Sequence, residues 1–263
     1  MISDNTYYRE VDLPVFREIV EPLLTGKILD IHVHARADVL AGHQHMMRNK
    51  YPGRELEKYP VKDLLETARL MWPGQEFHAL VFGMPTLELR DSSNEHVVRE
   101  CGQRDNLYPL YVPDLQATEA RIRSTILENG YLGFKPYWSL VEGKATEEEV
   151  SILDMLPTAY MRVAEELGLI IMLHIPGKGR LASQANIDNL RRLSREYRNA
   201  KIIIAHLGRS YCLWSMKGGI AKLCDLPNVY WDTSVVQEAM VFKVFFDRVD
   251  PAKAMYGTDL PIP

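Results

Sequence analysis

Lys27-Ile28-Leu29-Asp30-Ile31-His32-Val33-His34-Ala35 is the stretch of sequence from which the fold is worked out. It is mostly apolar before the histidines, favours a β-strand, and fits no helical period. Side chains alternate faces along a strand, so the two histidines and Asp30 share one face and the branched residues between them share the other. Two imidazoles about 7 Å apart along a strand can converge on one metal ion. Because short motifs also occur by chance, the metal interpretation depends on what ends the other strands.

Strand-like and helix-like segments alternate through the rest of the chain. Strands are expected at residues 27–34, 78–84, 107–113, 131–137, 169–174, 201–206, 228–233 and 254–259. Helical patterns lie between them at residues 61–71, 93–103, 119–129, 147–167, 187–198, 213–224 and 236–247, and a leading helix is expected at 14–24. Continuous apolar strands such as 169–173 suit a parallel sheet that is buried on both faces.

Eight βα units in 263 residues predict an α/β protein in which residues 1–263 form a single (β/α)8 TIM-barrel domain. An open doubly wound sheet is the alternative, and it is disfavoured because no glycine-rich phosphate turn follows the first strand. We expect a distorted barrel whose eighth helix is absent, since only four residues follow Asp259. Either the chain is truncated, or the N-terminal helix or a partner covers that edge.

Composition narrows the functional classes. The net charge of −4 argues against a nucleic-acid or membrane-surface binder. No apolar run reaches the ~18 residues of a membrane span, and the N-terminus lacks the pattern of a secretory signal. The cysteines Cys101, Cys212 and Cys224 are scattered and odd in number, which predicts reduced thiols and a cytoplasmic protein.

Residues able to bind a metal end several of the predicted strands. In a parallel barrel these ends converge on one mouth, where a shared metal site would be built. The ligand-type residues found there are His32, His34, His174, His206 and Asp259, and Lys135 ends the fourth strand. A lone strand-end histidine is usually structural, but this set predicts a common metal site.

The motifs His32-Val33-His34 and Gly257-Thr258-Asp259, with His174 and His206, resemble the amidohydrolase superfamily. More narrowly, they resemble its amidohydrolase-related branch (amidohydrolase 2), which holds small-molecule hydrolases, lactonases and metal-dependent decarboxylases. The resemblance runs from about Lys27 to the end, and family members normally continue past the last aspartate. It implies one divalent ion, usually zinc, held by His32, His34, His174 and Asp259. His206 would lie beside that ion as an acid/base or carbonyl-polarising group.

The chemistry of these residues agrees with that role. Three histidines and a carboxylate leave room for a metal-activated water. Asp259 can take the proton of that water and pass it to a leaving group. His206 can hydrogen-bond a substrate carbonyl as it gains charge. Asp30 either fixes a histidine tautomer or is a buried residue bonded to the backbone.

Lys135 has three possible roles. It could be carboxylated and bridge two metal ions, it could pair as an ammonium with a substrate carboxylate, or it could lie in water. Arg36 and Arg209, with Lys178 and Arg180, add positive charge at the inferred mouth. Such a group predicts a small, anionic substrate.

The polar stretch 35–60 is long enough to be a functional loop, and His43-Gln44-His45 within it is either part of a lid or an ordinary loop segment.

Three functions remain open from the sequence. The first is a metal-dependent hydrolase of a small, carboxylate-bearing molecule. The second is a non-oxidative decarboxylase of an aromatic or enoic acid, which would use the same ligands. The third is a barrel that binds a ligand without catalysis. A homo-oligomer is compatible with each of them.

Overall fold

The computed structural model describes residues 6–37, 58–216 and 218–261. His43 and His45, expected in either a lid or an ordinary loop segment, lie outside the described residues.

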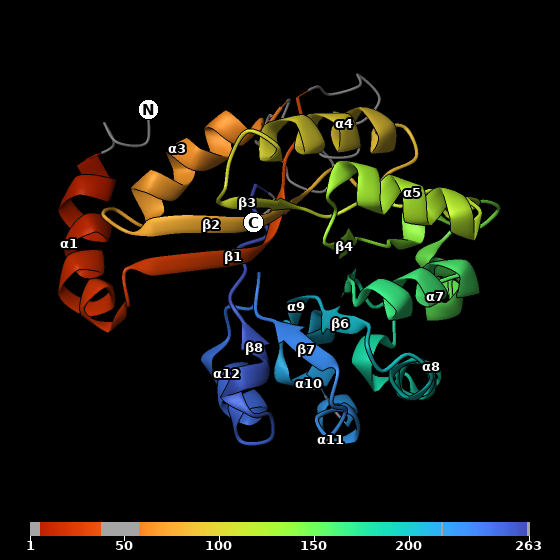
Figure 1. The fold of residues 1–263 in the computed structure, drawn as a ribbon. Helices are drawn as coiled ribbons and strands as arrows, with labels where there is room; N and C mark the ends of the chain where they lie inside the picture. Colours follow the sequence, from red (N-terminus) through yellow and green to blue (C-terminus); the bar gives the residue numbers. More distant parts are fainter. Residues whose placement is uncertain (1–5, 38–57, 217, 262–263) are drawn as a thin grey trace.

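Eight parallel strands alternate with helices, as predicted (Figure 1). The strands are β1 (Lys27–His34), β2 (Glu76–Phe82), β3 (Leu107–Pro109), β4 (Gly133–Phe134), β5 (Ile170–Leu173), β6 (Lys201–Ile204), β7 (Val229–Asp232) and β8 (Ala254–Met255). They form two parallel sheets, β1-β2-β3 and β4-β5-β6-β7-β8. Single bridges from Tyr111 to Phe134 and from Val33 to Leu260 join the sheets at both seams. This arrangement confirms the TIM-barrel prediction.

Helices lie on the outside of the strands. They are α3 (Val61–Met71), α4 (Arg90–Cys101), α5 (Glu119–Asn129), α7 (Thr158–Leu167), α8 (Gln184–Glu196), α10 (Leu213–Met216), α11 (Gly219–Leu223) and α12 (Ala239–Phe246). Within the described part of the chain no helix follows β8.

The prediction of one long helix over residues 147–167 is wrong. A 3-10 turn (Glu147–Glu149), a short helix α6 (Ile152–Met155) and α7 take its place. Ser151 and Asp154 form a capping box that starts α6, and Pro157 precedes α7. Proline removes a helical hydrogen bond, so a continuous helix through Pro157 is unfavourable.

The helix predicted over residues 213–224 is also divided. α10 and α11 are separate, and the residue before α11, Gly218, has a φ of 82°. A left-handed residue interrupts an α-helix because its carbonyl no longer follows the helix axis.

The N-terminal helix lies at one edge of the molecule and is less regular than predicted (Figure 1). Its turns are π-helical at Tyr8–Asp12 and Phe16–Val20, α-helical at Leu13–Val15 and 3-10 at Glu21–Leu23. Phe16 is buried against Trp72, with ring centroids 6.1 Å apart. We call the whole stretch Tyr8–Leu23 the N-terminal segment.

Buried apolar side chains divide into an inner cluster and two outer layers. The inner cluster collects side chains from opposite sides of the cylinder: Ile31, Leu80, Phe82, Leu110, Val112, Leu140, Met172, Ile203 and Ala205. A register shift between Asp30 and Val33 changes the expected alternation in β1. Ile31 therefore packs in the inner cluster while Val33 packs in an outer layer, although a regular strand would place both on one face.

Candidate metal centre

His32 and His34, at the end of β1, are buried with their Nδ1 atoms engaged. The Nδ1 of His32 lies 2.6 Å from Oδ2 of Asp232, and the Nδ1 of His34 lies 3.1 Å from the carbonyl oxygen of Gly83. Carboxylate and carbonyl oxygens accept hydrogen bonds, so both rings donate from Nδ1. In the neutral ring this leaves a lone pair on each Nε2.

Both Nε2 atoms face Asp259. Their distances to its Oδ1 are 3.0 Å for His32 and 3.3 Å for His34. The Nε2 of His32 has no well-directed hydrogen bond although it is fully buried. Two lone pairs that converge on a carboxylate repel one another unless a cation lies among them, so this donor set fits a divalent metal ion.

His206 completes the tightest group. One ligand atom from each of His32, His206 and Asp259 can be chosen so that all lie within 4.8 Å of one another. The Nδ1 of His206 lies 2.8 Å from the hydroxyl of Ser234 and 3.3 Å from the carbonyl oxygen of Ser234. The carbonyl fixes a proton on Nδ1, so the Nε2 of His206 also carries a lone pair when the ring is neutral.

The backbone that presents His206 is strained. After β6 the chain makes a left-handed turn, with φ of 55° at His206, 48° at Leu207, 71° at Gly208 and 63° at Arg209. Asp259 also has a positive φ of 65°. Left-handed conformations cost L-residues about 1–2 kcal/mol each, and such strain is concentrated at functional sites.

Burial and charge set the protonation of these groups. Burial and the neighbouring His32 lower the pKa of His206 to about 4, so its ring is neutral near pH 7. Burial alone raises the pKa of Asp259, but the neighbouring His32, His34 and His206 hold it well below its usual range. Asp259 is therefore a carboxylate.

Asp232 connects two of the histidines and was not singled out from the sequence. Its Oδ2 accepts from the Nδ1 of His32, from the Ser234 hydroxyl at 2.7 Å and from the His206 amide at 3.3 Å. Its Oδ1 accepts from the Ser234 amide at 2.8 Å. The sequence contains a signal that could have identified it. Asp232 ends the seventh strand, just as His206 and Asp259 follow the ends of the sixth and eighth strands. A carboxylate behind a histidine orients the ring and increases its basicity toward a metal.

The lack of a side chain at Gly257 allows Asp232 to lie close to His32. A Cβ at this position would lie 2.5 Å from Oδ1 of Asp232 and 2.9 Å from Cβ of His32. Any side chain at residue 257 would therefore separate Asp232 from β1.

His174, predicted as a ligand, lies next to the tightest group rather than within it. Its ring centroid is 5.5 Å from that of His206 and 4.5 Å from that of Tyr137. Its Nδ1 is buried and makes no hydrogen bond in the described structure. Burial, followed by the neighbouring His206 and Lys135, lowers its pKa well below the usual value.

Lys135 is buried, so the possibility that it lies in water is excluded. Its Nζ has no hydrogen-bond partner among the described residues and lies 5.2 Å from the centroid of Phe82 and 6.0 Å from that of Tyr137. Burial lowers its pKa from 10.5 to about 8, while Asp259 and Asp232 act in the opposite direction. The ammonium therefore remains the main form at neutral pH.

The two arginines predicted to bind substrate, Arg36 and Arg209, make contacts within the protein. Arg36 is buried, and its backbone pairs with Tyr59. Arg209 donates to Glu147 and, at 3.3 Å, to the carbonyl of Ile175.

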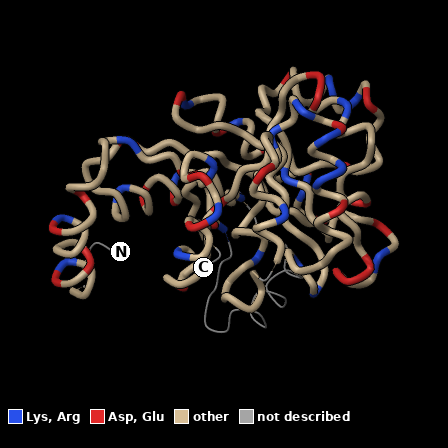
Figure 2. Tube along the Cα trace, turned by 90° about the horizontal axis from the view of Figure 1, so that it is seen from below, with Lys and Arg blue, Asp and Glu red and all other residues tan. Residues whose placement is uncertain are grey.

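The other two basic residues are held as well. Lys178 lies 3.5 Å from Glu148, and Arg180 donates to the carbonyl of Arg209 at 3.1 Å. Figure 2 shows Lys and Arg interspersed with Asp and Glu along the chain trace. Of the basic residues predicted at the mouth, Arg209 and Lys178 are thus each paired with a glutamate.

Asp30 makes no hydrogen bond to an imidazole of the described residues, and its partners lie elsewhere. It accepts from the amide of His32 at 3.1 Å and from the amide and hydroxyl of Thr258 at 3.0 and 2.6 Å. It is the buried, backbone-bonded residue of the two alternatives, and it ties β1 to the segment that carries Asp259.

Comparison with known proteins gives a match to one family. A sequence model of the family described as Amidohydrolase matches residues 29–263. A comparison with curated proteins gives no match. No described helix is long and apolar enough to cross a membrane.

Several solved structures share the fold. A dihydroxybenzoic acid decarboxylase from Polaromonas sp. JS666, with bound manganese and an inhibitor, is 13% identical, with a TM-score of 0.62 over 90% of this chain and 87% of that one. A provisionally named 2-pyrone-4,6-dicarboxylic acid hydrolase from Pseudomonas putida is 16% identical, with a TM-score of 0.60 over 90% and 84%. A 4-oxalomesaconate hydratase from Rhodopseudomonas palustris is 15% identical, with a TM-score of 0.61 over 89% and 82%.

Proposed function

Because the chain belongs to the amidohydrolase family, we propose that it is a metal-dependent hydrolase of a small molecule that carries a carboxylate. One observation supports this most directly. His32, His206 and Asp259 converge within 4.8 Å, although they come from opposite ends of the sequence. A structural role alone does not require three buried metal-binding groups to face one another.

We propose that His32, His34, His174 and Asp259 hold one divalent ion, with zinc as the first candidate. Such an ion acts as a Lewis acid and lowers the pKa of water toward 7. Manganese is the competing candidate, because the Polaromonas structure carries it. A second ion would require carboxylation of Lys135, whose buried amine is open to that reaction in its neutral form.

Asp259 and His206 have different roles in the proposed reaction. The ionised carboxylate of Asp259 is poised to take a proton and deliver it to the leaving group. His206 is engaged at Nδ1, so it acts through Nε2. In its Nε2-protonated form it would donate a hydrogen bond to the substrate oxygen as negative charge develops, with no net transfer of that proton.

Lys135 is the group we assign to the substrate carboxylate. Its ammonium is buried and without a hydrogen-bond partner among the described residues, and an unpaired buried cation gains strongly from an anionic ligand. Arg209 and Arg36 would assist from the rim. Arg209 would first have to exchange its contact with Glu147.

The second candidate is a non-oxidative decarboxylase. The ring of Tyr137 lies 4.5 Å from His174, and Lys135 is flanked by the rings of Phe82 and Tyr137. These aromatic surfaces suit a planar, unsaturated acid. In that reaction Asp259 would protonate carbon as CO2 leaves, with the same residues around it.

The two reactions are separated by their products. First probes are 2-pyrone-4,6-dicarboxylate and a dihydroxybenzoate, the compounds named for two of the structural neighbours. Ring-opened product supports the hydrolase, and released CO2 supports the decarboxylase. Treatment with a chelator should abolish either activity, and zinc or manganese should restore it.

Variants test the site itself. His174→Ala and Asp259→Asn should each abolish turnover while the circular dichroism spectrum is unchanged. His78→Ala is the matched control, because His78 bonds Glu76 and Tyr108 away from this centre and should keep activity. Full activity in both site variants would disprove the proposal and leave a barrel that only binds a ligand.

We also keep a cytoplasmic location as a proposal, supported by Cys101, Cys212 and Cys224, which are all free thiols.

A further inference from the structure

The hydroxyl of Ser234 lies between Asp232 and His206. Ser234 follows the end of β7 and is 1% exposed. Its Oγ is 2.7 Å from Oδ2 of Asp232 and 2.8 Å from Nδ1 of His206. The same Oδ2 is 2.6 Å from Nδ1 of His32. The four side chains therefore form one chain of hydrogen bonds, in the order His32, Asp232, Ser234, His206.

The position of the single hydroxyl proton of Ser234 sets the direction of this chain. Asp232 accepts from the backbone amides of Ser234 and His206, at 2.8 and 3.3 Å, and from His32, so it acts as a carboxylate with no proton to give. The proton in the 2.7 Å contact therefore comes from Ser234. A serine hydroxyl that has donated its proton can only accept. The Nδ1 of His206, which faces the Oγ of Ser234, must then carry a proton.

Ser234 offers two acceptors to the same ring nitrogen. Its carbonyl oxygen lies 3.3 Å from Nδ1 of His206, farther away than its Oγ at 2.8 Å. If the proton moved to Nε2, the lone pair of Nδ1 would face the lone pairs of both oxygens, and the buried hydrogen bonds would be lost. Nε2 is therefore the nitrogen that His206 presents to the site.

Asp232 thus orients both histidines, one directly and one through Ser234. The rings of His32 and His206 lie with their centroids 4.7 Å apart. Asp232 also accepts from the backbone amide of His206, so the backbone and the ring of this residue are held by the same pair of residues. The left-handed turn that carries His206 is thereby tied to the end of β7.

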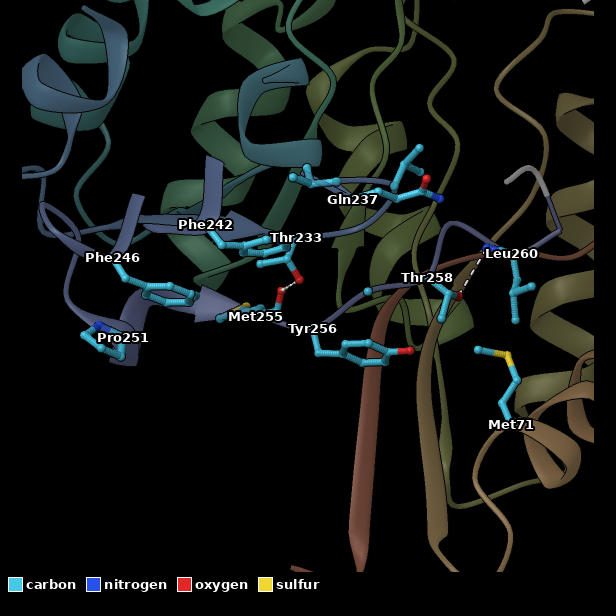
Figure 3. A pocket seen from close by; sticks show the side chains of 14 residues that line it. Met71, Thr233, Gln237, Phe242, Phe246, Pro251, Met255, Tyr256, Thr258 and Leu260 are labelled. Atoms are coloured by element: carbon cyan, nitrogen blue, oxygen red, sulfur yellow. Dashed lines mark hydrogen bonds between the residues drawn. The ribbon is translucent and has the colours of Figure 1, made fainter. Parts of the chain in front are cut away.

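The turn that carries Ser234 is itself fixed by the fold. Thr233 donates from its amide and from its hydroxyl to the carbonyl oxygen of Met255 in β8, at 3.0 and 3.1 Å. Figure 3 shows this turn from a pocket beside β8, with the bond of the Thr233 hydroxyl drawn as a dashed line. Val235 has a φ of 62°, which is an outlier for a β-branched residue. Strain of this kind persists only where the surrounding structure enforces it.

We propose that Ser234 is a positioning residue for the reaction. Its hydroxyl orients His206 with Nδ1 protonated and Nε2 toward the substrate, and it connects this ring to the carboxylate behind His32. The role of His206 toward the substrate rests on the proposed function, whereas the hydrogen-bond chain does not. Buried behind the ring, Ser234 does not itself reach the substrate.

The tautomer of His206 can be read from the unaltered chain. Long-range proton–nitrogen NMR correlations, on metal-free protein labelled with nitrogen-15 at histidine, distinguish a ring protonated at Nδ1 from one protonated at Nε2. His206→Gln assigns the signal by its absence. At pH 7 we expect the Nδ1-protonated tautomer. An Nε2-protonated ring would overturn the proposal without any substitution at Ser234.

Ser234→Ala tests the hydroxyl itself. It should reduce the Nδ1-protonated fraction of His206, because only the longer bond to the carbonyl remains. It should also move the Nδ1 proton resonance of His32 downfield, because the shared carboxylate loses one of its donors. Ser194→Ala is the matched control, since it removes a buried hydroxyl that bonds Asn228 at 2.5 Å, and it should change neither signal. Equal spectra for the two variants would overturn the proposal.

Kinetics test the positioning role on the zinc-loaded enzyme, with the probe that it turns over. Ser234→Ala should lower kcat by about 10–100-fold, as for other partners that orient a histidine of a metal site. KM should be unchanged, and Ser194→Ala should change neither constant. An unchanged kcat, or a loss that lies in KM alone, would overturn the positioning role and leave the hydrolase proposal in place. A chain without turnover would refute the proposed function, and the NMR results would still decide the hydrogen-bond chain.

Discussion

The carboxylate of Asp232 receives hydrogen bonds from both His32 and Ser234, and from the amide of His206. The side chain of Asp232 is fully buried and does not reach the solvent. Its effect on a metal would therefore act through His32, whose ring it orients.

Asp232→Asn should weaken zinc binding by about 10–100-fold, as expected for loss of a carboxylate behind a histidine ligand. The affinity is measured by competition with a chromophoric chelator, which does not depend on turnover. Asp225→Asn, which removes an exposed partner of Arg191, is the control and should bind zinc as the native chain does. Equal affinities in the two variants would show that Asp232 is only structural.

The buried ammonium of Lys135 should lower the free energy of unfolding, because burial lowers the pKa of this amine from 10.5 to about 8. Below pH 8 the amine is protonated in both the folded and unfolded chain, so the full penalty applies. The penalty fades between pH 8 and 10.5, where the unfolded chain binds the extra proton.

Lys135→Met should accordingly raise the free energy of unfolding of the metal-free protein by about 3 kcal/mol at pH 7. The gain should shrink above pH 8, and binding of carboxylate substrates should be lost. Urea denaturation at pH 7 and pH 10 measures the first effect. A variant that is less stable than the native chain at pH 7 would mean that the ammonium is satisfied in the fold.

Among the secondary structure elements, the left-handed turn after β6 determines where His206 lies. Four consecutive positive φ angles were not predicted, because the sequence pattern there favours a strand that runs through residue 206. The turn is held by backbone hydrogen bonds from Gly208 to Ala205 and from Ser210 to His206. It also presses Gly208 against Leu181.

Gly208→Ala should disrupt this turn. The new Cβ would lie 2.3 Å from Cδ1 of Leu181, at a φ of 71°. Gly143 provides a matched control, since it has a similar φ of 75° and a Cβ added there would have no neighbour within 4 Å. Gly208→Ala should cost about 1–3 kcal/mol more than Gly143→Ala from overpacking, measured by thermal unfolding. Equal costs would show that Leu181 moves aside freely.

The order of elements could be predicted from the sequence because alternation of strands and helices is a local property. The interruptions of the two helices predicted over residues 147–167 and 213–224 were not predicted, because single residues, Pro157 and Gly218, outweigh the apolar periodicity. The register shift in β1 was missed because it depends on the pairing with β2, which no single strand reveals.

At the scale of the whole molecule, the sequence predicts those residues of the candidate site that lie where the ends of the strands converge. His32, His206 and Asp259 were found by that criterion. The neutralisation of Arg209 by Glu147 was not, because it joins two loops whose contact depends on the folded barrel. Asp232 was missed although it satisfied the same criterion.

Metal binding should stabilise the whole fold, because its proposed ligands lie at or after the ends of β1, β5 and β8. At a thousandfold excess over Kd, a ligand adds about 4 kcal/mol, which corresponds to a rise in Tm on the order of 10 °C for a domain of this size. Differential scanning calorimetry with and without zinc measures it. Asp259→Asn should lose the rise, and an unchanged Tm in the native chain would contradict a shared site.

The most direct test of the shared metal site is an anomalous-difference map from crystals grown with zinc. The site predicts one peak between His32 and Asp259, at about 2.0–2.2 Å from Nε2 and from a carboxylate oxygen. The same map shows which of His34, His174 and His206 completes the coordination. A map with no peak between His32 and Asp259, or with its peak elsewhere, would contradict the shared site.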